Sequence, residues 1–324
     1  MPLQVEIWAE TIQEKLLQDN SFLNHVADVS SDNIIDGTIV HLPQAGDPSK
    51  VVKNRTTLPA AVQQRTDSEI LYKIDEYTTD PVHIKNADTK ELSYDKRRSV
   101  LDQDVANLSE EVAEGMLTNF VVSPVGANNA LPASNILLTT GAEIDATLAG
   151  ATGKRKAYSL TDLQTMRTKF VKDKAWSEGN MYALLTADAI AQLFPANSPI
   201  TATYMQATSE AERRAGVIYK VQGWQIMERS SVYVLDSANK EFKAFGAVGE
   251  ATDSEGNLFW NKNMLEKAIG KTEAFERIGD PTYYGDIYSF LVRCGGRARR
   301  KNYEGVAVLM QAPVDVTSGG GSED

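Results

Sequence analysis

Residues 86–122 read NADTKELSYDKRRSVLDQDVANLSEEVAEGMLTNFVV, and this stretch decides the fold. Its apolar residues recur at intervals of three and four, which places them on one stripe of a helix: Leu101, Val105, Leu108, Val112, Met116 and Phe120. Most other positions are polar or charged, so we predict one amphipathic helix over 88–122 that packs on one side only. Gly115 weakens it by about 1 kcal/mol relative to Ala. A helix of roughly 30 residues is about 45 Å long, which predicts an elongated molecule.

Composition narrows the class of protein. The chain has 324 residues, 42% of them hydrophobic, enough for a real core in one large domain or two. A formal net charge of -11 excludes a generally basic surface that wraps nucleic acid. The single cysteine, Cys294, excludes a disulfide framework and suits the cytosol. No apolar run approaches the roughly 18 residues needed to span a membrane, and the N-terminus lacks the pattern of a signal peptide.

The first 85 residues divide into two parts. Residues 3–18 have apolar side chains at helical spacing, which predicts a terminal helix that docks on this chain or a neighbour. Residues 38–42, 70–75 and 77–86 alternate like strands. The segment between the first two carries several prolines and few large apolar residues. We therefore predict an extended hairpin that projects from the body and is ordered by a partner rather than by its own core.

The remainder mixes helices and strands. Ser159 or Thr161, Thr186 and Ser209 are expected N-caps, and Gly216 an expected C-terminal glycine. Strands are predicted at 181–185, 217–226, 231–235, 288–294 and 306–310. Residues 258–269 are predicted to form a helix closed by Gly270, residues 295–305 a Gly- and Arg-rich connection, and residues 317–324 a flexible tail. The class is α+β, with no βαβ rhythm and no repeat.

The sequence contains almost no recognisable catalytic or ligand-binding motif. Residues 150–156 (GATGKRK) fail the phosphate-loop pattern, because Leu148 and Arg155 stand where Gly and Ser or Thr are required, so a basic surface loop is favoured. None of the three histidines has a metal-ligand neighbour at useful spacing. Cys294 has no histidine nearby in sequence, which favours a buried structural thiol over a nucleophile. We expect no catalytic, cofactor-binding or metal-binding residues, and no enzyme.

Two basic clusters remain, at residues 96–98 and at residues 293–301. They would suit either nucleic-acid contact or salt bridges to the acidic remainder, within or between subunits. The net charge of -11 favours salt bridges.

The order of parts is itself informative: an arm helix, a projecting hairpin, a long helix, a mixed α/β domain and a final pair of strands. The sequence resembles the major capsid protein of tailed bacteriophages, with the Hong Kong 97-type fold. The residues that carry the resemblance are 216–230 (GVIYKVQGWQIMERS), 247–251 with 259–269, 286–300 (DIYSFLVRCGGRARR) with 303–310, and 41–101 including VVKNR at 51–55.

The resemblance implies a domain organisation and a function. It divides the chain into an N-terminal arm (1–35), an extended loop (36–87), a peripheral domain with the spine helix (88–134), an axial domain (135–284), closing strands that return to the peripheral domain (285–312) and a tail (313–324). It implies a major capsid protein that self-assembles, as pentamers and hexamers, into an icosahedral shell enclosing double-stranded DNA. The shell would form in the bacterial cytoplasm and be found in the virion.

The implied partners are other copies of the chain, a separate scaffolding protein, a portal, and packaged DNA touched weakly by the inner surface. The arm helix begins near Leu3, which leaves no room for a scaffolding leader, so we expect the chain to enter the shell uncut. Candidate intersubunit contacts are Lys50, Lys53, Arg55, Arg65, Arg97, Arg98, Arg299 and Arg300. The self-crosslinking chemistry of some relatives cannot be placed on residues of this chain.

Two alternatives stay open. One is a cellular nanocompartment shell of the encapsulin type, which resembles the same fold but encloses an enzyme. The other is a nucleotide-using enzyme built around residues 150–156, which nucleotide binding by the soluble monomer would support.

Overall fold

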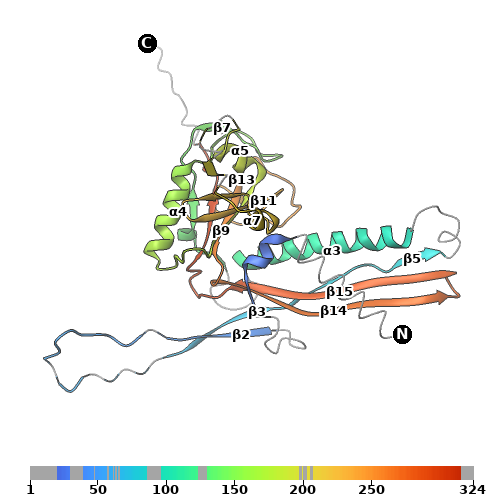
Figure 1. Ribbon diagram of the computed structural model, residues 1–324, viewed down its shortest axis with the longest axis horizontal. Helices are drawn as coiled ribbons and strands as arrows, with labels where there is room; N and C mark the ends of the chain where they lie inside the picture. The colour runs from blue at the N-terminus through green and yellow to red at the C-terminus, as the bar shows by residue number, and fades with distance from the viewer. Residues whose placement is uncertain are drawn as a thin grey trace, which may run out of the picture.

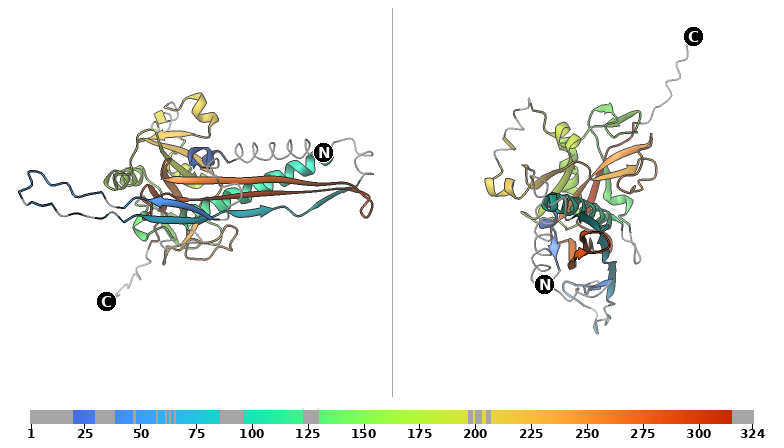
Figure 2. Two further views of the ribbon diagram at one scale, coloured as in Figure 1. Left: turned by 90° about the horizontal axis from the view of Figure 1, so that it is seen from below. Right: turned by 90° about the vertical axis from the view of Figure 1, so that its right-hand side faces the viewer.

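A computed structural model describes residues 20–29, 39–85 apart from 47, 57, 61, 63 and 65, then 96–122, 130–196, 199, 203–204 and 207–314. The molecule is elongated (Figures 1 and 2). A mixed lobe sits on one side of a long, narrow layer of strands and one helix. A thin hairpin leaves this layer at one end, and a pair of long strands forms the opposite end. The expected terminal helix at 3–18 lies outside the described residues.

The long helix is α3, Lys96–Val121. Its 26 residues give a length of about 39 Å. All six residues of the predicted stripe are buried, none more than 4% exposed, while Asp102, Gln103 and Glu110 on the opposite side are exposed. The prediction that this stripe is buried is therefore confirmed. Packing on one side only holds between Leu101 and Glu111, because no residue from Val112 to Val121 is exposed and Ala113, Leu117 and Val121 are buried as well. Residues 88–95, the expected beginning of this helix, lie outside the described residues.

A five-stranded sheet forms the layer against which α3 packs. Its centre is the antiparallel pair β14 (Leu265–Asp280) and β15 (Gly285–Ala298). The other strands are β1 (Ala27–Asp28), beside β14, and β4 (Asp75–Thr78) and β5 (Val82–Lys85), both beside β15. Gly296 on β15 permits α3 to lie close to the sheet. A Cβ at this position would lie 2.6 Å from the Glu266 carbonyl oxygen and 3.0 Å from the Phe120 ring of α3. The predicted connection at 295–305 thus begins as strand.

The predicted helix at 258–269 is wrong. Residues 253–261 form strand β13 (Asp253–Asn261), a turn follows, and β14 runs straight through Gly270. The turn is closed by the Met264 amide, which donates to the Asn261 carbonyl oxygen at 2.8 Å. All nine residues of β13 are buried, so the strand lacks the alternation that identifies a half-buried strand. One consequence is that the expected domain boundary at 284/285 falls in the turn between β14 and β15.

The lobe is built on a seven-stranded sheet. Its main path runs β10, β11, β9, β13, β16, β6, with β12 also paired to β13. The strands are β6 (Ile136–Leu138), β9 (Met181–Thr186), β10 (Tyr219–Val221), β11 (Trp224–Arg229), β12 (Tyr233–Asp236), β13 and β16 (Val306–Met310). The last two predicted strands therefore lie in different sheets. β9 and β11 are parallel, and helices lie in the chain between them. The lobe therefore contains one parallel crossover connection, although the sequence pattern predicts none.

Three helices of the lobe begin where predicted: α4 (Leu160–Lys172), α5 (Ala187–Leu193) and α7 (Glu210–Arg214). The described residues also form two 3-10 helices that the sequence did not predict, η1 (Ser21–His25) and η2 (Ala133–Asn135). The side chains of Ser159, Thr186 and Ser209 accept backbone N–H groups at the starts of α4, α5 and α7. Gly216 has φ of 89°, as a helix-terminating glycine requires.

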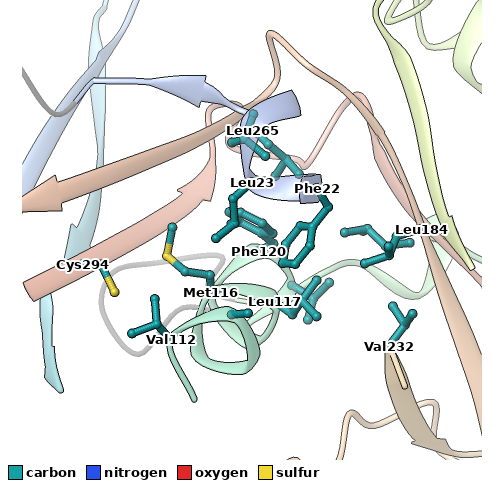
Figure 3. Packing of buried hydrophobic residues seen from close by; sticks show 14 of the residues in the cluster. Phe22, Leu23, Val112, Met116, Leu117, Phe120, Leu184, Val232, Leu265 and Cys294 are labelled. Carbon is teal, nitrogen blue, oxygen red and sulfur yellow. The ribbon is translucent and has the colours of Figure 1, made fainter. Parts of the chain in front are cut away.

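One apolar core joins the layer to the lobe. Figure 3 shows Phe120 and Leu117 of α3 packed beside Phe22 and Leu23 of η1, with Leu184 of β9 close by. The indole of Trp260 adds a polar tie, because its Nε1 donates to the His25 carbonyl oxygen at 2.9 Å. A second core on the other side of the sheet packs α4 and α5 around Trp224 and Phe259.

The predicted projecting hairpin is confirmed. β2 (Ile39–Gln44) pairs with β3 (Ser68–Lys73) in antiparallel register, from Ile39 opposite Lys73 to Gln44 opposite Ser68. The chain between them extends away from the body as a long open loop (Figure 1). We call residues 45–67 the tip segment.

Candidate interaction surfaces

The tip segment carries apolar side chains that are left exposed by the part of the chain that the structure describes. Val51, Leu58 and Val62 are 94%, 79% and 97% exposed. The predicted contact residues Lys50, Lys53 and Arg55 are exposed among them, and Arg65 lies outside the described residues. Such a row of exposed aliphatic and cationic side chains is typical of a segment that is buried by another molecule.

Polar side chains fix the hairpin to the body, and we call them the root cluster: the buried Tyr72, Glu266 and Arg297 and the partly exposed Gln44 and Arg299. The Tyr72 hydroxyl donates to Glu266 Oε1 at 2.8 Å, and Arg299 Nε lies 2.9 Å from Glu266 Oε2. Burial and the neighbouring Glu266 carboxylate raise the pKa of Tyr72, so its hydroxyl remains a donor. Arg297 and Arg299, which the sequence placed in a basic cluster, therefore serve contacts within the subunit.

An acidic groove of about 540 Å³ runs beside α3. Glu76 and Asp80 contribute carboxylates from the β4 side and Asp104 and Glu111 from the helix, and the described residues lining the groove include no Lys or Arg. Its apolar floor includes Tyr77 and Leu108. Desolvation raises the pKa of Asp104, as expected for a partly buried carboxylate.

The far end of the β14–β15 pair is a second exposed apolar region. Phe275, Ile278 and Tyr284 are at least half exposed there. The turn itself is held by Asp280, whose Oδ1 accepts the Thr282 amide at 2.7 Å and whose Oδ2 lies 2.8 Å from Arg277 Nε. The rigid turn thus presents its apolar side chains to solvent.

Three predicted contact residues remain to be placed. Arg97 and Arg98 lie in the first turn of α3, where the backbone is described but the side chains are not. Arg300 is exposed just beyond β15. No sequence motif singles out Glu266, Tyr72 or Gln44. Glu266 lies in the stretch 258–269, whose pattern predicts a helix, and Tyr72 is one alternating residue of a predicted strand.

The residues that the sequence offers as candidates for nucleotide binding or catalysis have structural roles. Arg155, expected on a basic surface loop, is 5% exposed in the β8 strand (Lys154–Lys156), which pairs with β7 (Glu143–Asp145). Its guanidinium donates to Ser254 Oγ at 2.9 Å and to backbone carbonyls, including that of Asp253 at 3.0 Å. The expectation of a surface position is therefore wrong for Arg155. Its guanidinium N–H groups donate to backbone carbonyl oxygens that the fold brings together, which allows the side chain to be buried.

Cys294 is buried as predicted, and burial beside Asp75 raises the pKa of its thiol to about 12. The described side chains contain no group of three or more His, Cys, Asp or Glu placed to hold a metal ion. Among the helices that the structure describes, none has the length and apolarity needed to cross a membrane.

Glu255 is a buried carboxyl in the lobe. It is 6% exposed and accepts the Thr186 hydroxyl at 3.1 Å. Burial, with Asp188 close by, raises its pKa to about 7. Its polar neighbours are Thr186 at the end of β9 and the exposed Asp188 and Thr147, so this carboxyl lies where the core of the lobe meets its surface.

Comparison with known proteins identifies the fold. No protein-family model and no curated protein matches the sequence. Among solved structures, the capsid of Ralstonia phage GP4 matches with a TM-score of 0.64 and 13% identity, covering 90% of this chain and 88% of that one. The mature capsid of bacteriophage PhiM1 matches with 0.56 and 11%, covering 88% and 85%. A virus-like particle from Pyrococcus furiosus matches with 0.52 and 10%, covering 94% and 99%.

The chain therefore has the fold of tailed-phage capsid proteins over about nine-tenths of its length, as the resemblance predicted.

Proposed function

We propose that this chain is the major capsid protein of a tailed bacteriophage, which self-assembles into the icosahedral shell around double-stranded DNA. The observation that supports this most is the combination of a capsid-type fold with a projecting segment whose apolar side chains are exposed in the single subunit. A shell subunit needs large lateral contacts, and an arm that reaches a neighbour supplies them without enlarging the subunit core.

The parts of the subunit take the roles that the resemblance assigns. The β2–β3 hairpin is the extended loop, α3 with the β14–β15 sheet is the peripheral domain, and the lobe is the axial domain. Because β14 pairs with β15 along its length, the peripheral domain also takes residues 265–280, and β16 belongs to the lobe.

The tip segment has a complementary surface within the same chain. Lys50, Lys53 and Arg55 stand among exposed aliphatic side chains. The acidic groove offers the carboxylates of Asp80, Asp104 and Glu111 beside apolar side chains, while Glu76 Oε2 already lies 3.9 Å from Arg293 Nε of the same subunit. We propose that the tip segment of one subunit lies in the acidic groove of its neighbour. Opposite charges at such a contact set its register and exclude wrong pairings.

A charge-swap experiment tests this contact. The pair Lys53→Glu and Arg55→Glu should abolish shells because it puts like charges together, and so should the pair Asp104→Lys and Glu111→Lys. All four changes in one chain should restore shells, as measured by light scattering and electron microscopy. Lys172→Glu with Lys174→Glu, on exposed lysines of the lobe, is the matched control and should assemble. Shells from the first pair alone, or none from the combined variant, would refute the contact.

The remaining partners follow from the role. A separate scaffolding protein and a portal would guide assembly in the host cytoplasm. Packaged DNA would be touched weakly, since the net charge of -11 limits contact to local basic patches. A cellular compartment shell remains the second candidate, on the likeness to the virus-like particle from Pyrococcus furiosus. The higher TM-score of 0.64 to the Ralstonia phage capsid favours the phage role.

A further inference from the structure

The attachment of the hairpin to the body has an unusual construction. Its two strands form a separate sheet, so among the described strands no backbone ladder joins the hairpin to the body. The apolar contact at its base is small, centred on Tyr72, Ile74 and Ala268. The apolar contact does not fix the direction of the hairpin, because apolar contacts are non-directional. The backbone holds only the body end of the hairpin: β3 continues through Ile74 into β4, which pairs with β15, and a Cβ on Gly295 would lie 2.6 Å from the Lys73 carbonyl oxygen. Farther along the hairpin, the directional contacts to the body come from side chains.

The root cluster supplies directional contacts to β3. Glu266, on β14 and 2% exposed, accepts the Tyr72 hydroxyl on one oxygen at 2.8 Å, while Arg299 Nε lies 2.9 Å from the other. Arg297, 1% exposed on β15, donates from Nη1 to the Leu71 carbonyl oxygen at 2.6 Å. Two neighbouring residues of β3 are thereby tied to two different strands of the body.

The other hairpin strand is tied at the point where the hairpin leaves the body. Gln44, the last residue of β2, donates from Nε2 to the Arg299 carbonyl oxygen at 2.8 Å. Swinging the hairpin would remove these partners and leave the buried Glu266 carboxylate and Arg297 guanidinium with fewer hydrogen bonds. That cost makes one angle strongly preferred.

We propose that the root cluster sets the angle at which the hairpin leaves the subunit. A second part of the proposal rests on the proposed shell function: the angle of the hairpin places each neighbouring subunit and so specifies the diameter of the shell. A small rotation at the root is magnified along the hairpin, which extends away from the body in Figure 1.

Pulsed dipolar spectroscopy on the soluble subunit tests the angle directly. Spin labels at Ser49→Cys in the tip segment and Lys172→Cys on α4 report one distance, and the buried Cys294 stays unlabelled. Tyr72→Phe and Glu266→Gln should each widen the distance distribution at least twofold. Tyr233→Phe is the matched control: its hydroxyl donates to the Leu117 carbonyl oxygen at 2.8 Å, away from the hairpin, so the width should not change. Unchanged widths in both root variants, or equal widening in the control, would overturn the proposal.

Particle size tests the second part. Wild-type shells should have one diameter by electron microscopy, and shells of Tyr72→Phe or Glu266→Gln should spread over several. A single wild-type diameter in both variants, with a widened hairpin distribution, would overturn the link to shell size. A wild-type chain that forms no particles would overturn the shell function, and the spectroscopic result would still decide whether the cluster sets the angle.

Discussion

The helix α3 and the tip segment carry similar apolar side chains in opposite circumstances. The α3 stripe is at most 4% exposed, whereas Val51 and Val62 of the tip segment are 94% and 97% exposed. Burying apolar surface stabilises by roughly 25 cal/mol per Å², so α3 contributes to the stability of the single subunit and the tip segment does not. The difference indicates that one region is built for folding and the other for assembly.

The largest effect on subunit stability is expected in the core. Phe120→Ala removes a ring that is 0% exposed and should lower the free energy of unfolding by about 3–5 kcal/mol, since the cavity cannot close fully. Urea denaturation of the soluble subunit measures this. Val62→Ala, at 97% exposure, is the control and should change it by less than about 0.5 kcal/mol. If both substitutions lowered the free energy of unfolding equally, the claim that α3 stabilises the subunit and the tip segment does not would be refuted.

The next effect depends on pH. The pKa of Glu255 rises from its usual 4.5 to about 7 on folding, so the folded state binds the proton more tightly and stability falls as pH rises through that window. Glu255→Gln cannot ionise and should be more stable than wild type at pH 8, by up to about 3 kcal/mol. Melting curves from pH 4 to 8 should be flatter for the variant. A wild-type stability that rises with pH in step with the variant would contradict this.

Gly115 gives a smaller effect of unexpected sign. Sequence reasoning predicts that Ala would strengthen the helix by about 1 kcal/mol. In the structure a Cβ on Gly115 would lie 1.7 Å from the Tyr77 hydroxyl, so β4 packs directly on the glycine. Gly115→Ala should therefore destabilise the subunit by about 1–2 kcal/mol net, because overpacking outweighs the helix preference. Ala106, exposed on the same helix, offers the reference substitution Ala106→Gly. A gain of stability at Gly115 would refute the packing argument.

The smallest effect on the subunit should accompany the largest effect on assembly. Charge reversal at Lys53 or Arg55 should leave the melting temperature of the monomer nearly unchanged and prevent shell formation, because both side chains are exposed. Differential scanning calorimetry and light scattering measure the two properties. A large fall in monomer stability would show that the tip segment belongs to the folded core.

The sequence predicted the elements whose signals are local. The α3 stripe and the caps Ser159, Thr186 and Ser209 are confirmed because each signal depends on spacings of three or four residues along the chain. The helix expected at 258–269 fails because burial of both faces of β13 removes the alternation of a strand. The root cluster could not be predicted, since Tyr72 and Glu266 are 194 residues apart and neither stands in a recognisable motif.

The central claim is that this chain forms a shell in which the tip segment is buried by a neighbour. Electron microscopy of the protein, alone and coexpressed with the proposed scaffolding protein, tests it most directly. We predict closed icosahedral particles of pentamers and hexamers, with Val51 and Val62 covered by an adjacent subunit. A monomer under every assembly condition, or shells in which the tip segment stays exposed to solvent, would contradict the account.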